Sequence, residues 1–408
     1  MIKAISGGVT AAQGFRASAA EAGIKYQGRM DMAMLFADVP CRAAGTFTTN
    51  VVKAAPVLWD RQIVCEKGTA QAVVMNSGIA NACTGEEGME YCRRTAQAAG
   101  EVLGIPAENV LVASTGVIGM QLPIDRIVAG TKALASKLDS SESAGNEAAR
   151  AIMTTDTVPK EMAVQVTIGG KTVTVGGMCK GSGMIHPNMC TMLSFLTTDV
   201  CISQELLLHA LREDVKDTYN MVSVDGDTST NDTVLLLSSG LAGNPEITEM
   251  NEDYEQFAAA LREVNTCLAK KIAGDGEGAT ALFEVQVIGA ASKEDAVKLS
   301  KSVVGSSLTK AAIYGHDANC GRVLCALGYA GVPFDPEKVD LTFTSGAGTI
   351  KVIENGVFTD FSEEQATEIL SDSHVTAIAD MKMGECSATA WGCDLTHEYV
   401  SINADYRS

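Results

Sequence analysis

Hydrophobic and polar positions alternate with two different periods along this 408-residue chain. Apolar residues spaced three or four apart predict helices, whereas alternating or short continuous apolar runs predict strands. Helical spacing is found at residues 89–103, 124–138, 206–211 and 257–272. Strand patterns are found at residues 31–37, 71–75, 109–113 and 233–237. Ser292 and Ser362 have the surroundings of helix N-caps. Because helices and strands are interspersed throughout, the pattern predicts an α/β (α+β) fold of packed layers.

A hairpin is predicted around Gly169-Gly170. Residues 161–168 and 171–178 have strand patterns, and two adjacent glycines suit a turn whose central positions need positive φ. The sequence Gly169-Gly-Lys-Thr172 also ends like a phosphate-binding loop. However, Gln165 stands where that motif needs its first glycine, and a strand is predicted to follow where the motif needs a helix. No nucleotide phosphate site is therefore expected.

The composition limits the classes of partner. With 46% hydrophobic and 20% charged residues, the chain can bury a large core and is expected to form more than one layer or lobe. Its net charge of −19 argues against a nucleic acid or an anionic membrane as partner, because binding phosphates needs clustered Lys and Arg. No signal-peptide run and no stretch of about 18 apolar residues occurs, so a cytoplasmic location is expected.

The cysteines and histidines form no metal-binding pattern. The chain has twelve Cys without a Cys-x-x-Cys pair, and none of its five His lies at ligand spacing from another. The cysteines are therefore expected to be buried small side chains in a reducing compartment. Neither a disulfide framework nor a metal site is predicted.

The segment from Lys180 to Phe195 contains a candidate nucleophile. Its Gly- and Pro-containing loop ends at Cys190-Thr191, and an apolar strand pattern then continues to Val200. A hydroxyl is a weak nucleophile unless a base lies beside it. If the Cys190-Thr191 bond were cut, the freed α-amine of Thr191 would titrate near neutral pH and could act as that base. The alternative is a structural Thr whose hydroxyl bonds to the backbone where a strand starts.

This segment resembles the self-cleavage segment of the ornithine acetyltransferases, the bifunctional glutamate N-acetyltransferase family of arginine biosynthesis. Other blocks of the chain resemble the same family in the same order. They are Gly45–Asn50, Asn76–Gly85, Ser114–Gly119, Thr154–Thr157, Asp275–Thr280, Gly315–Arg322 and Ile402–Ser408. Each block alone is a weak signal, but together they span nearly the whole chain and are specific.

The resemblance implies a fold, a processing step and a reaction. The fold would be the family's sandwich of β-sheets flanked by helices, which self-cleaving aminopeptidases share. Cleavage would divide the chain into an α chain, 1–190, and a β chain, 191–408, assembled as two α and two β chains. Thr191 would then take the acetyl group of N2-acetylornithine and pass it to glutamate. No metal and no organic cofactor would be needed.

The resemblance also assigns roles to individual residues. Thr115 and Gly116 would stabilise the oxyanion. The substrate-binding positions would be Thr154, Lys180, Thr191, Glu277, Asn403 and Ser408.

The residues themselves support several of these assignments. A Ser-Thr-Gly turn after a buried strand can present the Thr115 hydroxyl and backbone N–H groups, with Gly116 permitting close approach. Glycines flank Glu277, which suits a carboxylate held on a tight loop for a cationic amine. Alternating apolar residues at 400–404 predict a terminal strand that would hold Asn403 in place.

The chain departs from the usual family pattern at three positions. Cys190, Ala281 and Cys320 stand where Ala, Lys and Trp are common in the family. Cys190 is small, so cleavage is still expected. Its thiol makes it a rival nucleophile, ranked below Thr191 because cleavage would leave it at a chain end.

Two other functions stay open. The first is an aminopeptidase or amidase on the same scaffold, in which water would replace glutamate as the acceptor. The second is a catalytically inactive binding protein that keeps the fold. Within the family reading, acetyl-CoA as an additional donor is also open, because it separates bifunctional from monofunctional members.

Overall fold

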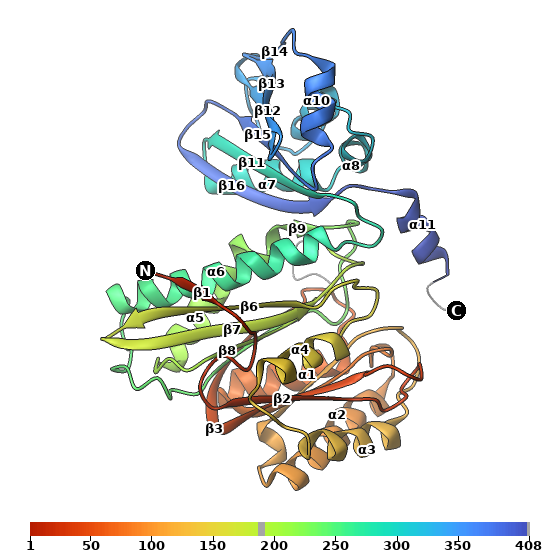
Figure 1. Ribbon diagram of the computed structural model, residues 1–408, viewed down its shortest axis with the longest axis vertical. Helices are drawn as coiled ribbons and strands as arrows, with labels where there is room; N and C mark the ends of the chain where they lie inside the picture. The colour runs from red at the N-terminus through yellow and green to blue at the C-terminus, as the bar shows by residue number, and fades with distance from the viewer. Residues whose placement is uncertain (187–191, 406–408) are drawn as a thin grey trace. The chain divides into compact units, whose positions relative to one another are not determined.

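The computed structural model describes residues 1–186 and 192–405 (Figure 1). The chain forms two compact units. Unit 1 comprises Met1–Gly181, Thr191–Thr218 and Thr228–Leu268, and unit 2 comprises Ser182–Cys190, Tyr219–Asp227 and Ala269–Ser408. The expected α/β layers and the expectation of more than one lobe are confirmed. Within the described ranges no helix is both long and apolar enough to cross a bilayer.

Unit 1 is built on a nine-stranded sheet with the order β1-β6-β7-β8-β10-β3-β4-β5, and β2 pairs with β3. The strands are β1 Lys3–Ile5, β2 Phe15–Ala20, β3 Met32–Phe47, β4 Thr69–Asn76, β5 Val110–Ser114, β6 Lys160–Ile168, β7 Lys171–Lys180, β8 Leu193–Thr198 and β10 Thr233–Ser238. The predicted hairpin is β6–β7, and Gly169 and Gly170 have φ of 53° and 75°. A strand, β7, follows Gly170, as the sequence predicted.

Both faces of the β3–β5 part of this sheet are buried. Side chains alternate between the faces along a strand. Met34 and Val74 point to the face covered by α2 and α3, which lie side by side in Figure 1. Leu35 and Val73 point to the opposite face, against α4. Burial on both faces explains why these strands are almost continuously hydrophobic.

The helices of unit 1 follow the predicted apolar stripes. They are α1 Ala55–Gln62, a π-helix Ile63–Lys67, α2 Glu86–Leu103, a 3-10 turn Ala107–Asn109, α3 Ile124–Ala135, α4 Glu142–Ala151, α5 Gln204–Asp217 and α6 Glu252–Gly274. Helix α6 begins in unit 1 and ends in unit 2.

Unit 2 is built on a seven-stranded sheet with the order β14-β13-β12-β15-β11-β16-β9. Its strands are β9 Val222–Ser223, β11 Leu282–Ala290, β12 Asp340–Ser345, β13 Gly348–Glu354, β14 Val357–Phe358, β15 His374–Asp380 and β16 Cys386–Cys393. Its helices and 3-10 turns are Tyr219–Met221, α7 Lys293–Val304, α8 Ser307–Tyr314, α9 Cys320–Gly328, Pro336–Lys338, α10 Glu363–Leu370 and α11 His397–Ala404. Helix α7 packs on β11 and β16, and α10 packs on β12 and β13.

Both predicted N-caps of unit 2 are confirmed. The Ser292 hydroxyl accepts the Asp295 N–H at 3.1 Å, and the Ser362 hydroxyl accepts the Gln365 N–H at 3.2 Å. Each hydroxyl satisfies a backbone donor that the first turn of a helix leaves free.

The predicted terminal strand is wrong, because residues 397–404 form helix α11. No residue of α11 is buried, and Val400 is 66% exposed. Three alternating apolar residues are too short a run to specify a strand, and a helix pairs its own backbone groups without a neighbouring strand.

The expectation of buried cysteines is only partly correct. All described cysteines are free thiols. Cys41, Cys92, Cys179 and Cys393 are buried, but Cys65, Cys83 and Cys325 are exposed. Burial of a thiol depends on which face of a helix or strand carries it, and the number of cysteines does not contain that information.

Candidate functional site

A tight turn after β5 carries Thr115 and Gly116 in unit 1. Gly116 has φ of 129°, and a Cβ added there would lie 2.3 Å from the carbonyl carbon and oxygen of Gly78. Only glycine fits this close approach of two backbones. The turn is pinned on both sides, because Thr115 N donates to Asn76 O at 3.0 Å and Val117 N donates to Gly78 O at 3.1 Å. The turn is therefore a rigid platform.

Two buried asparagines hold this platform in place. Asn76 accepts the Ser114 hydroxyl at 2.7 Å and donates to Ile79 O at 2.9 Å. The surroundings of Asn231 favour the amide orientation in which its nitrogen donates to Ala80 O at 2.8 Å and Ser114 O at 3.2 Å. Asn231 thereby ties the segment before β10 to the platform.

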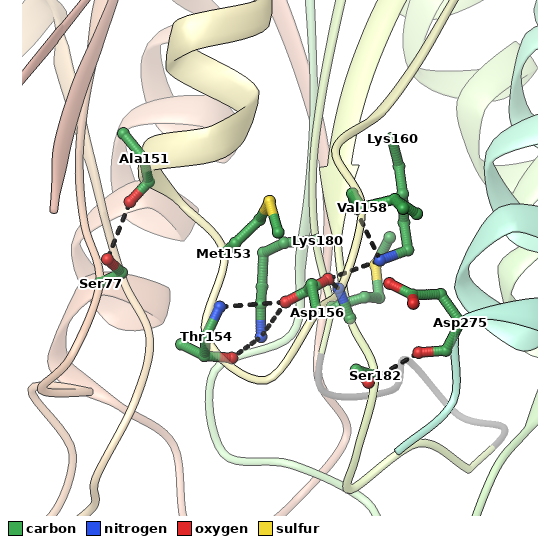
Figure 2. A network of polar contacts seen from close by, with 12 residues as sticks. Ser77, Ala151, Met153, Thr154, Asp156, Val158, Lys160, Lys180, Ser182 and Asp275 are labelled. Carbon is green, nitrogen blue, oxygen red and sulfur yellow. Dashed lines mark hydrogen bonds and ion pairs between the residues drawn. The ribbon is translucent and has the colours of Figure 1, made fainter. Parts of the chain in front are cut away.

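The Lys180 cluster consists of Thr154, Asp156, Lys160 and Lys180, all in unit 1 (Figure 2). Lys180 Nζ donates to the Thr154 hydroxyl at 2.8 Å and lies 3.7 Å from Asp156 Oδ2. Asp156 Oδ1 accepts Lys160 Nζ and Gly181 N, both at 2.7 Å. The cluster therefore brings together two of the predicted substrate-binding residues, Thr154 and Lys180.

The Lys180 cluster is buried, although a lysine is more often exposed. Lys180 is 3% exposed, and the Asp156 side chain is fully covered. Burial alone would raise the pKa of Asp156. The Lys180 and Lys160 ammonium groups outweigh burial, together with the hydrogen bonds from Lys160 and Gly181, and hold that pKa far below its usual range. Asp156 therefore stays ionised and fixes the Lys180 side chain.

The strand register places Lys180 beside the start of β8. Lys180 pairs with Leu193 across β7 and β8, and Leu193 pairs with Thr233 across β8 and β10. The residues just before these two strands are also in contact, because Met192 N donates to Asp232 Oδ1 at 3.1 Å. The neighbouring strands β7, β8 and β10 of unit 1 therefore surround the start of β8, next to Met192, the residue that follows the predicted nucleophile in sequence.

Glu277 and Asn403 meet in unit 2. Asn403 Nδ2 donates to Glu277 Oε2 at 2.7 Å and to Tyr399 O, one helical turn earlier, at 2.9 Å. Glu277 is 6% exposed, and its N–H donates to Ser182 O at 3.0 Å. A Cβ on Gly183 would lie 2.3 Å from the Glu277 carboxyl carbon, so a larger residue there would displace this carboxyl group. The predicted glycine-flanked loop around Glu277 is confirmed.

A second carboxylate of unit 2 anchors helix α11. Asp225 Oδ2 accepts the Tyr399 hydroxyl at 3.2 Å, and the carboxyl also accepts Met184 N at 2.6 Å and Ile185 N at 2.8 Å. Burial raises the pKa of Asp225 despite these hydrogen bonds, and burial followed by the Asp225 charge raises the pKa of Tyr399. A cavity of about 500 Å³ lies beside Asp225 and Tyr399, between α8 and α11.

Three predicted site residues lie outside the described residues. They are Cys190, Thr191 and Ser408. In the ranges 1–186 and 192–405, no group of three or more His, Cys, Asp and Glu side chains could hold a metal ion.

Sequence reasoning missed three polar residues of the site: Asp156, Lys160 and Asp232. Asp156 lies inside the Thr154–Thr157 block, and Lys160 follows it by four residues, but nothing in the pattern shows that both are buried. Asp232 precedes a strand, where an acidic residue usually belongs to a solvated turn. Asp232 is buried because the strand that follows it, β10, pairs with β8 on one side and with β3 on the other.

Comparisons with known proteins agree on one family. The ArgJ family matches residues 16–408. The arginine biosynthesis bifunctional protein ArgJ of Symbiobacterium thermophilum is 54% identical over 406 residues, which cover 99% of each chain. That of Thermotoga neapolitana is 51% identical over 381 residues, 93% of this chain and 95% of its own. A crystal structure of the Bacillus halodurans ArgJ protein is 46% identical, covers 52% of this chain and 99% of its own, and has a TM-score of 0.51.

Proposed function

Because this chain belongs to the ArgJ family, we propose that it is an arginine-biosynthetic acetyltransferase that moves an acetyl group from N2-acetylornithine to glutamate. The observation that carries the proposal is the 54% identity, over 99% of both chains, to a protein named as an arginine biosynthesis bifunctional protein. The bifunctional relatives favour acetyl-CoA as an additional acetyl donor. A cytoplasmic assembly of two α and two β chains is part of the same proposal.

The nucleophile is Thr191, made available by cleavage after Cys190. Cleavage converts the amide nitrogen of Thr191 into a free α-amine, which accepts the hydroxyl proton as the oxygen attacks. A free α-amine titrates near pH 8, so about a tenth of it is unprotonated at pH 7 and can act as the base. Two chains result, 1–190 and 191–408.

The first half-reaction forms an acetyl-enzyme. Thr191 Oγ bonds to the acetyl carbon of N2-acetylornithine, and the carbonyl oxygen becomes an oxyanion. The Thr115 hydroxyl and the Gly116 N–H donate hydrogen bonds to this oxyanion and stabilise it. One such donor contributes about 2.7–4 kcal/mol to lowering the barrier in well-studied enzymes. The α-amine then gives its proton to the ornithine nitrogen as the C–N bond breaks. In the second half-reaction the glutamate amine attacks the ester and Thr191 Oγ regains a proton.

The two polar clusters suit the charges of the substrates. Lys180 and Thr154 carry N–H and O–H groups that can bind a substrate carboxylate, and the ionised Asp156 holds them in place. The Glu277 carboxylate, oriented by Asn403, suits the side-chain ammonium of ornithine. Ser408 completes the set by family resemblance.

Trapping the acetyl-enzyme tests the proposal. The purified protein is incubated with N2-acetylornithine alone, and its fragments are weighed by mass spectrometry. One acetyl group should appear on the fragment that begins at Thr191, and added glutamate should remove it as N-acetylglutamate. Release of free acetate at the same rate without glutamate would contradict transfer and support the amidase alternative. The Thr131→Ala variant is a matched control, because the buried Thr131 hydroxyl bonds only within its helix, to Ile127 O at 2.8 Å.

A further inference from the structure

The cavity between α8 and α11 has no part in the proposed transfer reaction. Its volume of about 500 Å³ is within the usual range of small-molecule sites, about 300–1,000 Å³. It is lined by α8, by the start of α11 and by the segment that follows β9. Every described residue that lines it belongs to unit 2, and none of them is a residue assigned to the reaction.

The walls of the cavity are largely apolar. Val224 and Leu395 are buried wall residues, whereas Tyr314 and Val400 also line the cavity but are 40% and 66% exposed. The Tyr314 ring meets the His397 ring edge to face, with centroids 6.1 Å apart. Apolar side chains that gather around a hollow mark a surface that a ligand or partner covers. An occupant of this cavity would therefore have an apolar or aromatic body.

Lys310, which also lines the cavity, is a buried cation. It is 3% exposed, and its Nζ donates to Cys393 O and lies 3.6 Å from Cys393 Sγ. Among the described residues, no carboxylate forms an ion pair with Lys310. An ammonium has three N–H donors, and a thiol sulfur is only a weak acceptor. Because buried charges are costly unless they are paired, this ammonium favours an anion as its partner.

The carboxylate that lines the cavity already has its full set of donors. Asp225 Oδ1 accepts Ile185 N at 2.8 Å and Asp227 N at 3.2 Å. Its Oδ2 accepts Met184 N at 2.6 Å and the Tyr399 hydroxyl at 3.2 Å. A carboxylate has about four acceptor positions, and these bonds use all of them. The charge that is left to bind a ligand is therefore the positive one.

The backbone around Lys310 adds to the positive potential. Lys310 lies one turn into α8, and its carbonyl oxygen accepts Leu395 N at 3.2 Å, just before α11 begins. Both helices therefore start near this lysine, and the N-terminus of a helix favours negative charge. The Thr396 hydroxyl donates to Gly278 O at 2.7 Å and does not cap the first turn of α11.

We propose that this cavity binds a small organic carboxylate with an apolar or aromatic body. The carboxylate pairs with Lys310 Nζ, and the body lies against Tyr314 and Val400. Such a ligand would pair a buried charge and cover exposed apolar surface in one step. The site is separate from the Glu277–Asn403 pair, and it does not depend on the proposed function.

Calorimetric titration of the purified protein with 3-phenylpropanoate tests the proposal. A ligand of this size should bind with a Kd of about 1 mM or tighter. Its uncharged analogue, 3-phenylpropanamide, should bind roughly 10- to 100-fold more weakly, because it makes no hydrogen bond between two charged groups. Equal affinities for the acid and the amide, or no binding of the acid at millimolar concentration, would overturn the proposal.

Two lysine variants locate the probe. Lys310→Met keeps the length of the side chain and removes its charge, so its affinity for 3-phenylpropanoate should fall roughly 10- to 100-fold, to that of the amide. Lys298→Met is the matched control, because Lys298 is an exposed lysine of unit 2 that pairs with Glu294 at 2.7 Å. It should bind the probe like the wild type. Wild-type affinity in Lys310→Met, or an equal loss in Lys298→Met, would place the probe elsewhere and contradict the inference.

A further variant tests the same cavity if Lys310→Met does not fold. Val400 is 66% exposed on a helix without buried residues, so Val400→Glu should leave the midpoint of thermal unfolding nearly unchanged. The new carboxylate would repel the probe, and the affinity should fall by roughly 10-fold or more. Ser401→Glu adds the same charge one residue further along α11, outside the described lining, and should bind like the wild type. Wild-type affinity in Val400→Glu, or the same loss in both variants, would refute the site.

Discussion

At the scale of single residues, we expect the stability of the fold to be especially sensitive to substitutions that remove a buried charge from the Lys180 cluster. Asp156 accepts hydrogen bonds from Lys160 and Gly181 and lies against Lys180. Removing one member of a buried ion pair usually costs about 3–5 kcal/mol, because the remaining charge stays buried. Asp156→Asn should lower the free energy of unfolding at pH 7 by about this amount, measured by urea titration.

The effect of Asp156→Asn should also depend on pH. The pKa of Asp156 is lowered in the folded state, so its stabilising contribution is complete above the unfolded pKa of about 3.9 and is lost as the pH falls toward the folded pKa. The difference between wild type and variant should therefore shrink below about pH 4. Asp38→Asn is the control, because Asp38 and Arg16 form an exposed pair, worth about 0–1 kcal/mol. Equal losses in the two variants would contradict the account.

Which residues belong to the candidate site could be predicted from the sequence more readily than how those residues are buried and bonded. Thr115, Gly116 and Glu277 were singled out by resemblance to the family, and the glycines in their turns added a local signal. Asp232 left none, since its burial results from strand pairs that join residues some 40 positions apart in sequence. Long-range pairing of this kind has no local pattern.

At the scale of elements, the hairpin β6–β7 and the capped helices α7 and α10 could be predicted, because each is specified by neighbouring residues. Helix α11 could not be predicted. None of its three apolar residues is buried, so no buried face distinguishes a helix from a strand in the sequence. The helix is held in unit 2 by polar contacts of Asn403 and Tyr399.

Substitution of Asn403 should therefore affect substrate binding more than folding. Asn403→Ala removes the donor to the Glu277 carboxylate, a type of hydrogen bond worth about 1.5–3 kcal/mol. The KM for N2-acetylornithine should rise by roughly 10- to 100-fold, while the midpoint of thermal unfolding falls only slightly, because α11 has no buried residue and Tyr399 still bonds to Asp225. Ser401→Ala, an exposed change on the same helix, should leave KM unchanged. A fall in unfolding temperature with unchanged KM would instead make Asn403 a structural residue.

At the scale of the whole molecule, the proposed cleavage would have to precede the proposed acetyl transfer. The 408 residues form two units by their contacts, whereas cleavage at Cys190-Thr191 would divide the chain at a different place. Residues on both sides of this bond build unit 1, since residues 175–180 of β7 pair with residues 193–198 of β8. The cut chains would therefore remain joined by a shared sheet.

The measurement that tests this account most directly is the intact mass and N-terminal sequence of the purified protein, compared with Thr191→Ala. The wild type should give two fragments, one of which begins Thr191-Met-Leu-Ser, and Thr191→Ala should remain a single chain of 42.6 kDa. A wild type that stays uncut, or a Thr191→Ala variant that is cut at the same bond, would contradict the central claim that Thr191 cleaves the chain and then carries the acetyl group.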